Sequence, residues 1–126
     1  MLALWLAPNV LAVTYVAPEP LPEAVEAPIT NEKTIDEVIH LSAVKHGVSE
    51  SLMRQIIKCE SGFRPDAVGD AGYSFGLVQI HLPSHPAVTK EQALDPEFAT
   101  DFLAKNLSVD KGSMWTCYRM LQSSDY

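Results

Sequence analysis

The sequence has little positive charge, no long uninterrupted apolar run and only two cysteines. Nine Lys and Arg stand against sixteen Asp and Glu, which gives a formal net charge of −7. Nucleic-acid-binding domains are usually basic, so this balance argues against a nucleic-acid partner held by a positive patch. A length of 126 residues allows one small domain, and a hydrophobic content of 47% is enough to build its core.

The first 17 residues form an apolar run without charge that is short for a membrane span of ~20 residues and is interrupted by Pro8. It resembles the hydrophobic region of a signal peptide, with a small-residue cleavage site at residues 10–12. The basic residues that normally precede such a region are missing. Either the natural start lies upstream, or the run is an uncleaved anchor that tethers the protein to a membrane, or it is a buried strand.

Residues 18–33 are rich in Pro and Glu, which is typical of an extended linker. An apolar N-terminus, a linker and then a domain at residues 34–126 is the layout of an exported protein. We therefore expect a periplasmic, cell-envelope or extracellular location.

Capping patterns divide the domain into helices, and no internal repeat is visible. Thr34 opens a capping box and Gly47 ends the helix that follows, while Ser49 caps a second helix that ends at Glu60. Residues 61–88 hold four of the six glycines, so we expect loops and a small β-hairpin there. Further cap patterns at Thr89 and Asp95 and a last helix over residues 114–121 complete a mostly α domain with an irregular insert.

Glu60 occupies a position on the apolar face of the second predicted helix. Met53, Ile56 and Ile57 share that face, and Glu60 is the next residue along it. Burial and the negative end of the helix dipole would both disfavour the ionised carboxylate. A carboxyl group that stays protonated near neutral pH can act as a general acid. The alternative is a glutamate at a frayed helix end that faces water.

The chain has two cysteines. Cys59 immediately precedes Glu60, and Cys117 lies in the aromatic cluster of residues 115–118 near the C-terminus. A bond between them would hold the chain end beside Glu60 and would stabilise the domain by about 4 kcal/mol in the loop-entropy model. The alternative is a pair of buried reduced thiols. The export-like N-terminus favours the disulfide.

Two motifs resemble those of the soluble lytic transglycosylases, a lysozyme-like family with Glu-Ser at a helix end and Gly-Leu-Met-Gln further on. They are residues 59–63, Cys-Glu-Ser-Gly-Phe, and residues 72–80, Gly-Tyr-Ser-Phe-Gly-Leu-Val-Gln-Ile. The Cys-Glu-Ser-Gly string and a late Trp-x-Cys also resemble the related resuscitation-promoting factor domains. The resemblance covers about residues 35–121 and implies a mostly α (α+β) lysozyme-like fold whose loop and hairpin insert forms a glycan groove.

The resemblance implies cleavage of the β-1,4 bond between N-acetylmuramic acid and N-acetylglucosamine in peptidoglycan, by a monomer without cofactor or metal. Glu60 matches the single catalytic acid/base, and Ser61 matches the serine that hydrogen-bonds around it. Gly76, Leu77 and Gln79 match the second motif, which lines the groove. A 1,6-anhydromuramyl product is implied. The alternatives are a lysozyme-type hydrolase of the same bond and a non-catalytic module that binds cell-wall glycan.

Several other residues have two interpretations. Tyr118 matches the tyrosine of the family's Ala-Tyr-Asn motif, although its neighbours are Cys117 and Arg119. Tyr73 and Phe75 could stack on sugar rings or could pack over a small core. Gln79 could instead satisfy loop backbone groups. Asp66 or Asp70 could be the second carboxylate of a hydrolase or could cap a turn.

Trp115 is expected in the core. The prolines near His81 and His85 argue against a metal site at these two histidines.

Overall fold

A computed structural model describes residues 14–18 and 32–124 of the chain. The chain divides into two units, Met1–Asn31 and Glu32–Tyr126. In the first unit, residues 14–18 form neither helix nor strand. Most of the predicted signal-like segment and linker lies outside the described residues. Within the described ranges, no helix is both long enough and apolar enough to cross a membrane.

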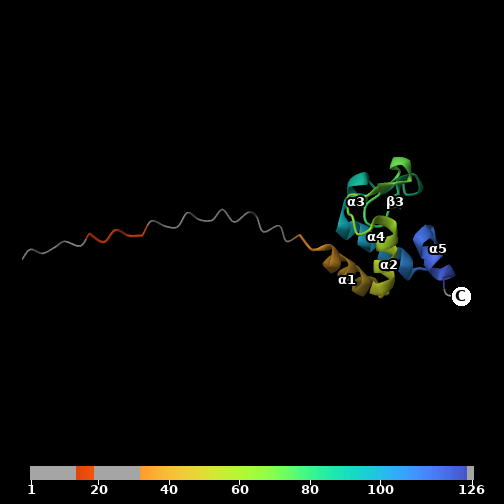
Figure 1. Ribbon diagram of the computed structural model, residues 1–126, viewed down its shortest axis with the longest axis horizontal. Helices are drawn as coiled ribbons and strands as arrows, with labels where there is room; N and C mark the ends of the chain where they lie inside the picture. Colours follow the sequence, from red (N-terminus) through yellow and green to blue (C-terminus); the bar gives the residue numbers. More distant parts are fainter. Residues whose placement is uncertain (1–13, 19–31, 125–126) are drawn as a thin grey trace, which may run out of the picture. The chain divides into compact units, whose positions relative to one another are not determined.

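The second unit is a mostly helical domain with a small antiparallel sheet, which confirms the predicted fold class (Figure 1). The sheet and α3 form one end of the unit, α1 and α2 form the other, and α4 contacts both α1 and α3. The elements are α1 (Ile35–His46), α2 (Glu50–Ser61), β1 (Val68–Gly69), η1 (Asp70–Gly72), β2 (Ser74–Phe75), β3 (Ile80–His81), η2 (Leu82–Ser84), α3 (Lys90–Leu94), α4 (Pro96–Ser108), η3 (Gly112–Met114) and α5 (Thr116–Ser123).

The predicted helix caps are present. Thr34 accepts a hydrogen bond from the Glu37 N–H at 3.2 Å, and the Glu37 carboxylate accepts one from the Thr34 N–H at 2.8 Å. Gly47 ends α1 in the left-handed conformation, with φ 65°. The caps at Ser49, Thr89 and Asp95 also form as expected.

Three details differ from the sequence-based expectation. The insert contains three strands in the order β1-β2-β3 rather than one hairpin, with Phe75 paired to both Val68 and Ile80. The second helix continues one residue beyond Glu60, to Ser61. The last helix begins at residue 116, because residues 112–114 form a separate 3-10 turn. Periodicity alone does not resolve turns as short as these.

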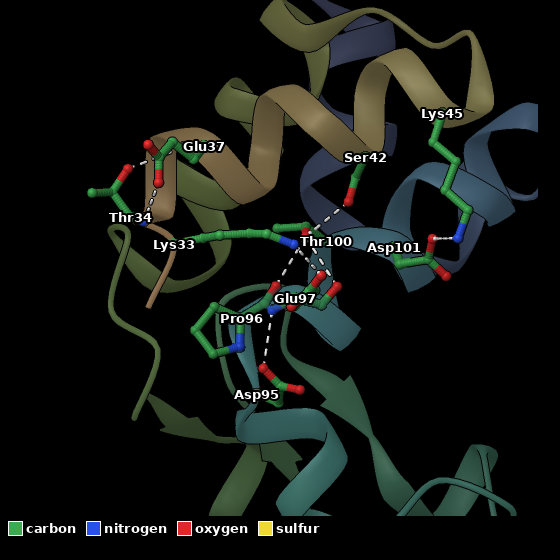
Figure 2. A network of polar contacts seen from close by, with 10 residues as sticks. All are labelled: Lys33, Thr34, Glu37, Ser42, Lys45, Asp95, Pro96, Glu97, Thr100 and Asp101. Atoms are coloured by element: carbon green, nitrogen blue, oxygen red, sulfur yellow. Dashed lines mark hydrogen bonds and ion pairs between the residues drawn. The ribbon is translucent and has the colours of Figure 1, made fainter. Parts of the chain in front are cut away.

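A buried hydrogen bond joins the α1 and α4 helices, and exposed ion pairs lie around it (Figure 2). The Ser42 hydroxyl donates to Thr100 Oγ1 at 3.0 Å in the interior of the pair. Lys45 contacts Asp101 at 2.8 Å on the outside, where an exposed ion pair contributes only about 0–1 kcal/mol. The buried hydrogen bond and the exposed ion pair both connect α1 to α4.

The core lies where α1, α2 and α4 meet the sheet and the loop before β3. Met53, Ile56 and Ile57 of α2 are fully buried in it, as the predicted apolar face requires. Glu60 follows on the same helix. The other fully buried apolar residues of the described chain are Ile39, Leu77, Val78, Ile80, Ala93, Ala99, Leu103 and Ala104.

Candidate active site

Glu60 lies in the last turn of α2 and is half-buried. The two isoleucines that precede it, Ile56 and Ile57, have no exposed surface and hold this end of the helix against the core. The Glu60 carboxylate accepts a hydrogen bond from the backbone N–H of Cys117, with a distance of 3.3 Å to Oε1. A frayed end turned toward water does not describe this carboxylate.

The surroundings of Glu60 favour its protonated form. Burial raises the pKa of the Glu60 carboxyl above its ordinary value, and the negative charge of Asp70 raises it further. The Cys117 N–H and the positive charge of Arg119 act in the opposite direction but do not cancel the increase. A half-buried carboxyl with a raised pKa and one N–H donor can give up a proton and then be stabilised as an anion.

The predicted disulfide between Cys59 and Cys117 is present, and the alternative of two reduced thiols is wrong. It joins Cα atoms 5.9 Å apart and spans 58 residues of sequence. Because Cys59 immediately precedes Glu60, the bond places the Cys117 N–H beside the carboxylate. The disulfide thus links α2 to the start of α5 at the position of Glu60.

The second motif, residues 76–79, forms a tight loop between β2 and β3. Gly76 has φ 82°, and a Cβ there would collide with the carbonyl oxygen of Ala93 in α3. Gln79 also has a left-handed backbone, with φ 51°, and its side-chain amide donates to the carbonyls of Gly76 at 2.9 Å and Ala67 at 3.1 Å. The amide nitrogen of Gln79 therefore holds the loop, as the structural interpretation of this residue expected, and Leu77 is fully buried beneath it.

Trp115 fastens the chain before α5 to this loop. Its indole N–H donates to the carbonyl of Val78 at 2.7 Å, and the residue is 5% exposed. The expectation that Trp115 belongs to the core is confirmed. Two residues later, Cys117 contacts Glu60. The segment 115–117 consequently bridges the second motif and the carboxylate.

The family model for the Transglycosylase SLT domain matches residues 37–119 of the chain. The chain belongs to this family. The match runs from α1 to α5 and includes Glu60, the loop of residues 76–79 and the Cys117 segment. A search of the solved structures returned no significant match. Membership makes this a domain of the lytic transglycosylase family, whose members act on peptidoglycan of the cell wall; the resemblance to resuscitation-promoting factor domains remains a prediction.

The SLT domain uses two of its predicted site residues for structure. The Ser61 hydroxyl is buried and donates to the carbonyl of Ile57 at 3.1 Å, so it completes the last turn of α2. Phe75 is 8% exposed and belongs to the core, with Lys90 Nζ 5.1 Å from its ring centroid. Phe75 therefore packs in the core, as one of its two interpretations expected, and stacking of its ring on a sugar stays a prediction.

Two tyrosines of the SLT domain have different surroundings. Tyr73 is 57% exposed, with its ring centroid 6.4 Å from that of His81, so its ring is open to a ligand. Tyr118 is half-buried and packs so closely on Gly112 that a Cβ there would meet the tyrosine ring at 2.8 Å. A contact between Tyr118 and Glu60 remains a prediction.

Two charged residues shift the pKa of Glu60 in opposite directions. They are Asp70, expected from the sequence only as a second carboxylate or a turn cap, and Arg119, expected only as a departure from the family motif. Asp70 has a left-handed backbone, with φ 49°, and accepts a hydrogen bond from the Ser74 hydroxyl at 2.5 Å. Arg119 stands where the family motif has asparagine, a substitution that marks it in the sequence. Over residues 14–18 and 32–124, no group of three or more His, Cys, Asp or Glu is arranged to hold a metal ion.

Proposed function

We propose that the protein is an exported peptidoglycan lytic transglycosylase in which Glu60 is the single acid/base. The observation that carries the proposal is the half-buried Glu60 carboxyl, whose raised pKa and contact with the Cys117 N–H suit proton transfer in both directions. The product would be a 1,6-anhydromuramyl end. A disulfide beside the carboxylate supports an oxidising, extracytoplasmic location. Residues 1–17 would be a signal peptide or a membrane tether, and the domain would work as a monomer.

The proposed reaction needs one carboxyl group in two successive roles. Glu60 first donates its proton to the glycosidic oxygen, and the bond from that oxygen to the muramyl C1 breaks. The N-acetyl carbonyl of the same sugar stabilises the electron-poor C1, as in substrate-assisted glycosidases that lack a second carboxylate. Glu60, now anionic, accepts the proton of the muramyl 6-hydroxyl while its oxygen bonds to C1. The Cys117 N–H stabilises the Glu60 anion between the two steps. The second proton transfer returns Glu60 to its protonated state.

Asp70 gives a specific reason to consider a second outcome, hydrolysis of the same bond. It is the carboxylate whose charge raises the pKa of Glu60, and the hairpin turn holds it through Ser74. A second carboxylate near the acid could direct a water molecule to C1, as in two-carboxylate glycosidases. Water would then take the place of the 6-hydroxyl, and the product would be a reducing muramyl end.

The test is mass spectrometry of the products released from purified peptidoglycan. Anhydromuramyl ends, which are lighter by one water than reducing ends, are the expected result. Predominantly reducing ends would establish the hydrolase instead. If the protein binds the wall material but releases no fragments, the non-catalytic binding module is correct.

A further inference from the structure

A hollow of about 330 Å³ lies between the end of β3, η2, α4 and η3. Its walls include Gln79 and Trp115, the two residues that hold the second motif and the segment leading to Cys117. The hollow is therefore built on the same framework as the Glu60 site. None of the functions assigned above uses the other residues that line it.

Two imidazoles line this hollow. The His81 Nδ1 atom lies 2.8 Å from the Ser84 hydroxyl, which orients that ring and leaves its other nitrogen free of this contact. The His85 ring packs edge-on against Phe102, with centroids 5.1 Å apart. Burial, and then the nearby charge of His81, lower the pKa of His85, so this ring is neutral at neutral pH and offers one N–H donor.

The hollow differs in charge from the protein as a whole. Its lining, all within the described residues, contains no Asp or Glu, although acidic residues exceed basic ones by seven in the sequence. The Phe102 and Trp115 rings provide an apolar floor beside the imidazoles. Imidazole N–H donors without competing carboxylates, in a partly apolar hollow, suit a carboxylate better than a neutral hydroxyl.

We propose that the hollow binds a carboxylate carried by the muramic acid side chain, through N–H donors of His81 and His85. This inference rests on the proposed function, since it names the part of peptidoglycan that the site selects. The carboxylate has two sources with the same chemistry: the free lactyl group of a strand without peptide, or an acidic residue of the stem peptide. In either case the hollow distinguishes muramyl glycan from a neutral glycan of the same linkage.

The first test is steady-state kinetics of the whole chain on peptidoglycan and on the same material with its carboxylates amidated. The wild-type KM should be about tenfold lower on the untreated material, as expected for one charge-assisted hydrogen bond. The double variant His81→Gln/His85→Gln should lose that preference and keep kcat. His40→Gln, which replaces an exposed histidine of α1, is the matched control and should keep the preference for the untreated material. A double variant that still prefers the untreated material would overturn the proposal.

Strands stripped of peptide by an amidase separate the two sources. If the histidine effect persists on them, the lactyl carboxylate is the ligand; if it is lost there, the stem peptide supplies the carboxylate. Should the wild-type chain cleave nothing, the proposed function fails, and binding decides the present proposal. N-acetylmuramic acid or a muramyl peptide, whichever carries the carboxylate that binds, should then shift the imidazole NMR signals of His81 and His85, and the amidated form of that probe should not. Equal shifts from the acid and the amide, or no shift with either probe, would refute carboxylate binding.

Discussion

At the scale of single residues, the acidity of Glu60 results from neighbours that act in opposite directions. Burial and Asp70 favour the protonated form, and the Cys117 N–H and Arg119 favour the anion. Folding favours the neutral form of Glu60, because the folded protein raises its pKa. Below the ordinary carboxyl pKa the side chain is neutral in both the folded and the unfolded protein, so its burial carries no ionisation cost there. The fold loses stability as the pH rises through the raised pKa and Glu60 ionises.

Replacing Glu60 tests its role directly. Glu60→Gln should reduce cleavage by at least about 10³-fold, because the amide keeps the shape of the side chain but cannot transfer the proton. The melting temperature at neutral pH should equal or exceed that of the wild type, since the variant has no buried carboxyl to ionise. Product release and thermal denaturation are the measurements. Glu91→Gln, at an exposed position of α3, should change neither; near wild-type cleavage by Glu60→Gln would end the assignment.

The two charges near Glu60 predict opposite shifts of the pH–rate profile. Asp70→Asn removes a negative charge that raises the pKa of Glu60, so the loss of activity at high pH should begin at a lower pH. Arg119→Gln removes a positive charge that lowers the pKa, so the same loss should begin at a higher pH. Initial rates across the pH range, with the wild type alongside, give the comparison. Shifts in the same direction would contradict this account of the site.

Most of the residue-level description could be predicted, but not all of it. Glu60 and the two cysteines stand out in the sequence because helix periodicity and short motifs concern neighbouring residues. The surroundings of Phe75 and Ser61 could not be predicted, because an aromatic ring or a hydroxyl in a motif has the same sequence whether it faces a ligand or the interior. The effects of Asp70 and Arg119 depend on contacts between distant segments.

At the scale of elements, the helices follow from local capping chemistry, and the sheet does not. Thr34, Ser49, Thr89 and Asp95 mark the helix starts because each cap bonds to a residue close in sequence. The strands have two residues each and follow from left-handed turns at non-glycine residues such as Gln79. Such backbone conformations are uncommon outside glycine and have no sequence pattern that would predict them.

Gly76 and Gly72 lie in the connections between the three strands, and each position favours glycine for a different reason. Both have a left-handed φ, 82° and 93°, but only at Gly76 would a Cβ meet other atoms within 4 Å, foremost the Ala93 carbonyl. Gly76→Ala should therefore lower the melting temperature and displace the loop from α3, with a loss of cleavage. Gly72→Ala should cost only the backbone strain, about 1–2 kcal/mol. Thermal denaturation of both variants measures the difference, and equal losses would mean that the close approach to α3 is unimportant.

At the scale of the whole molecule, the Cys59–Cys117 disulfide joins the end of α2 to the start of α5. Helix propensities and caps act over a few residues, so they could not establish this connection; the compartment argument from the N-terminus favoured it. The structure adds what the bond does. It holds α2 and α5 together where the Cys117 N–H meets Glu60.

Reduction of this bond should affect stability and activity together. Releasing a cross-link across 58 residues should cost about 4 kcal/mol in the loop-entropy model, which is a large share of the stability of a small domain. The melting temperature should fall by many degrees in reductant, and cleavage should weaken as the Cys117 N–H loses its fixed position. Peptide mapping with thermal denaturation is the measurement, and Cys59→Ser/Cys117→Ser, tested without reductant, should match the reduced wild type. Two free thiols in protein from an oxidising compartment would contradict the prediction.

The position of the hydrogen-bond donor to Glu60 has a consequence for timing. The carboxylate is at residue 60, but its partner comes 57 residues later in the chain and is held there by a bond that needs an oxidant. A nascent chain that has been synthesised only as far as α2 contains the Glu60 carboxyl but not yet the Cys117 N–H that stabilises its anion. The Glu60 contact therefore requires that Cys117 has been synthesised, and the bond that holds Cys117 in place requires an oxidising environment. Under the proposed function, the enzyme would be less active inside the cell that makes it and would reach full activity in the oxidising compartment to which it is exported.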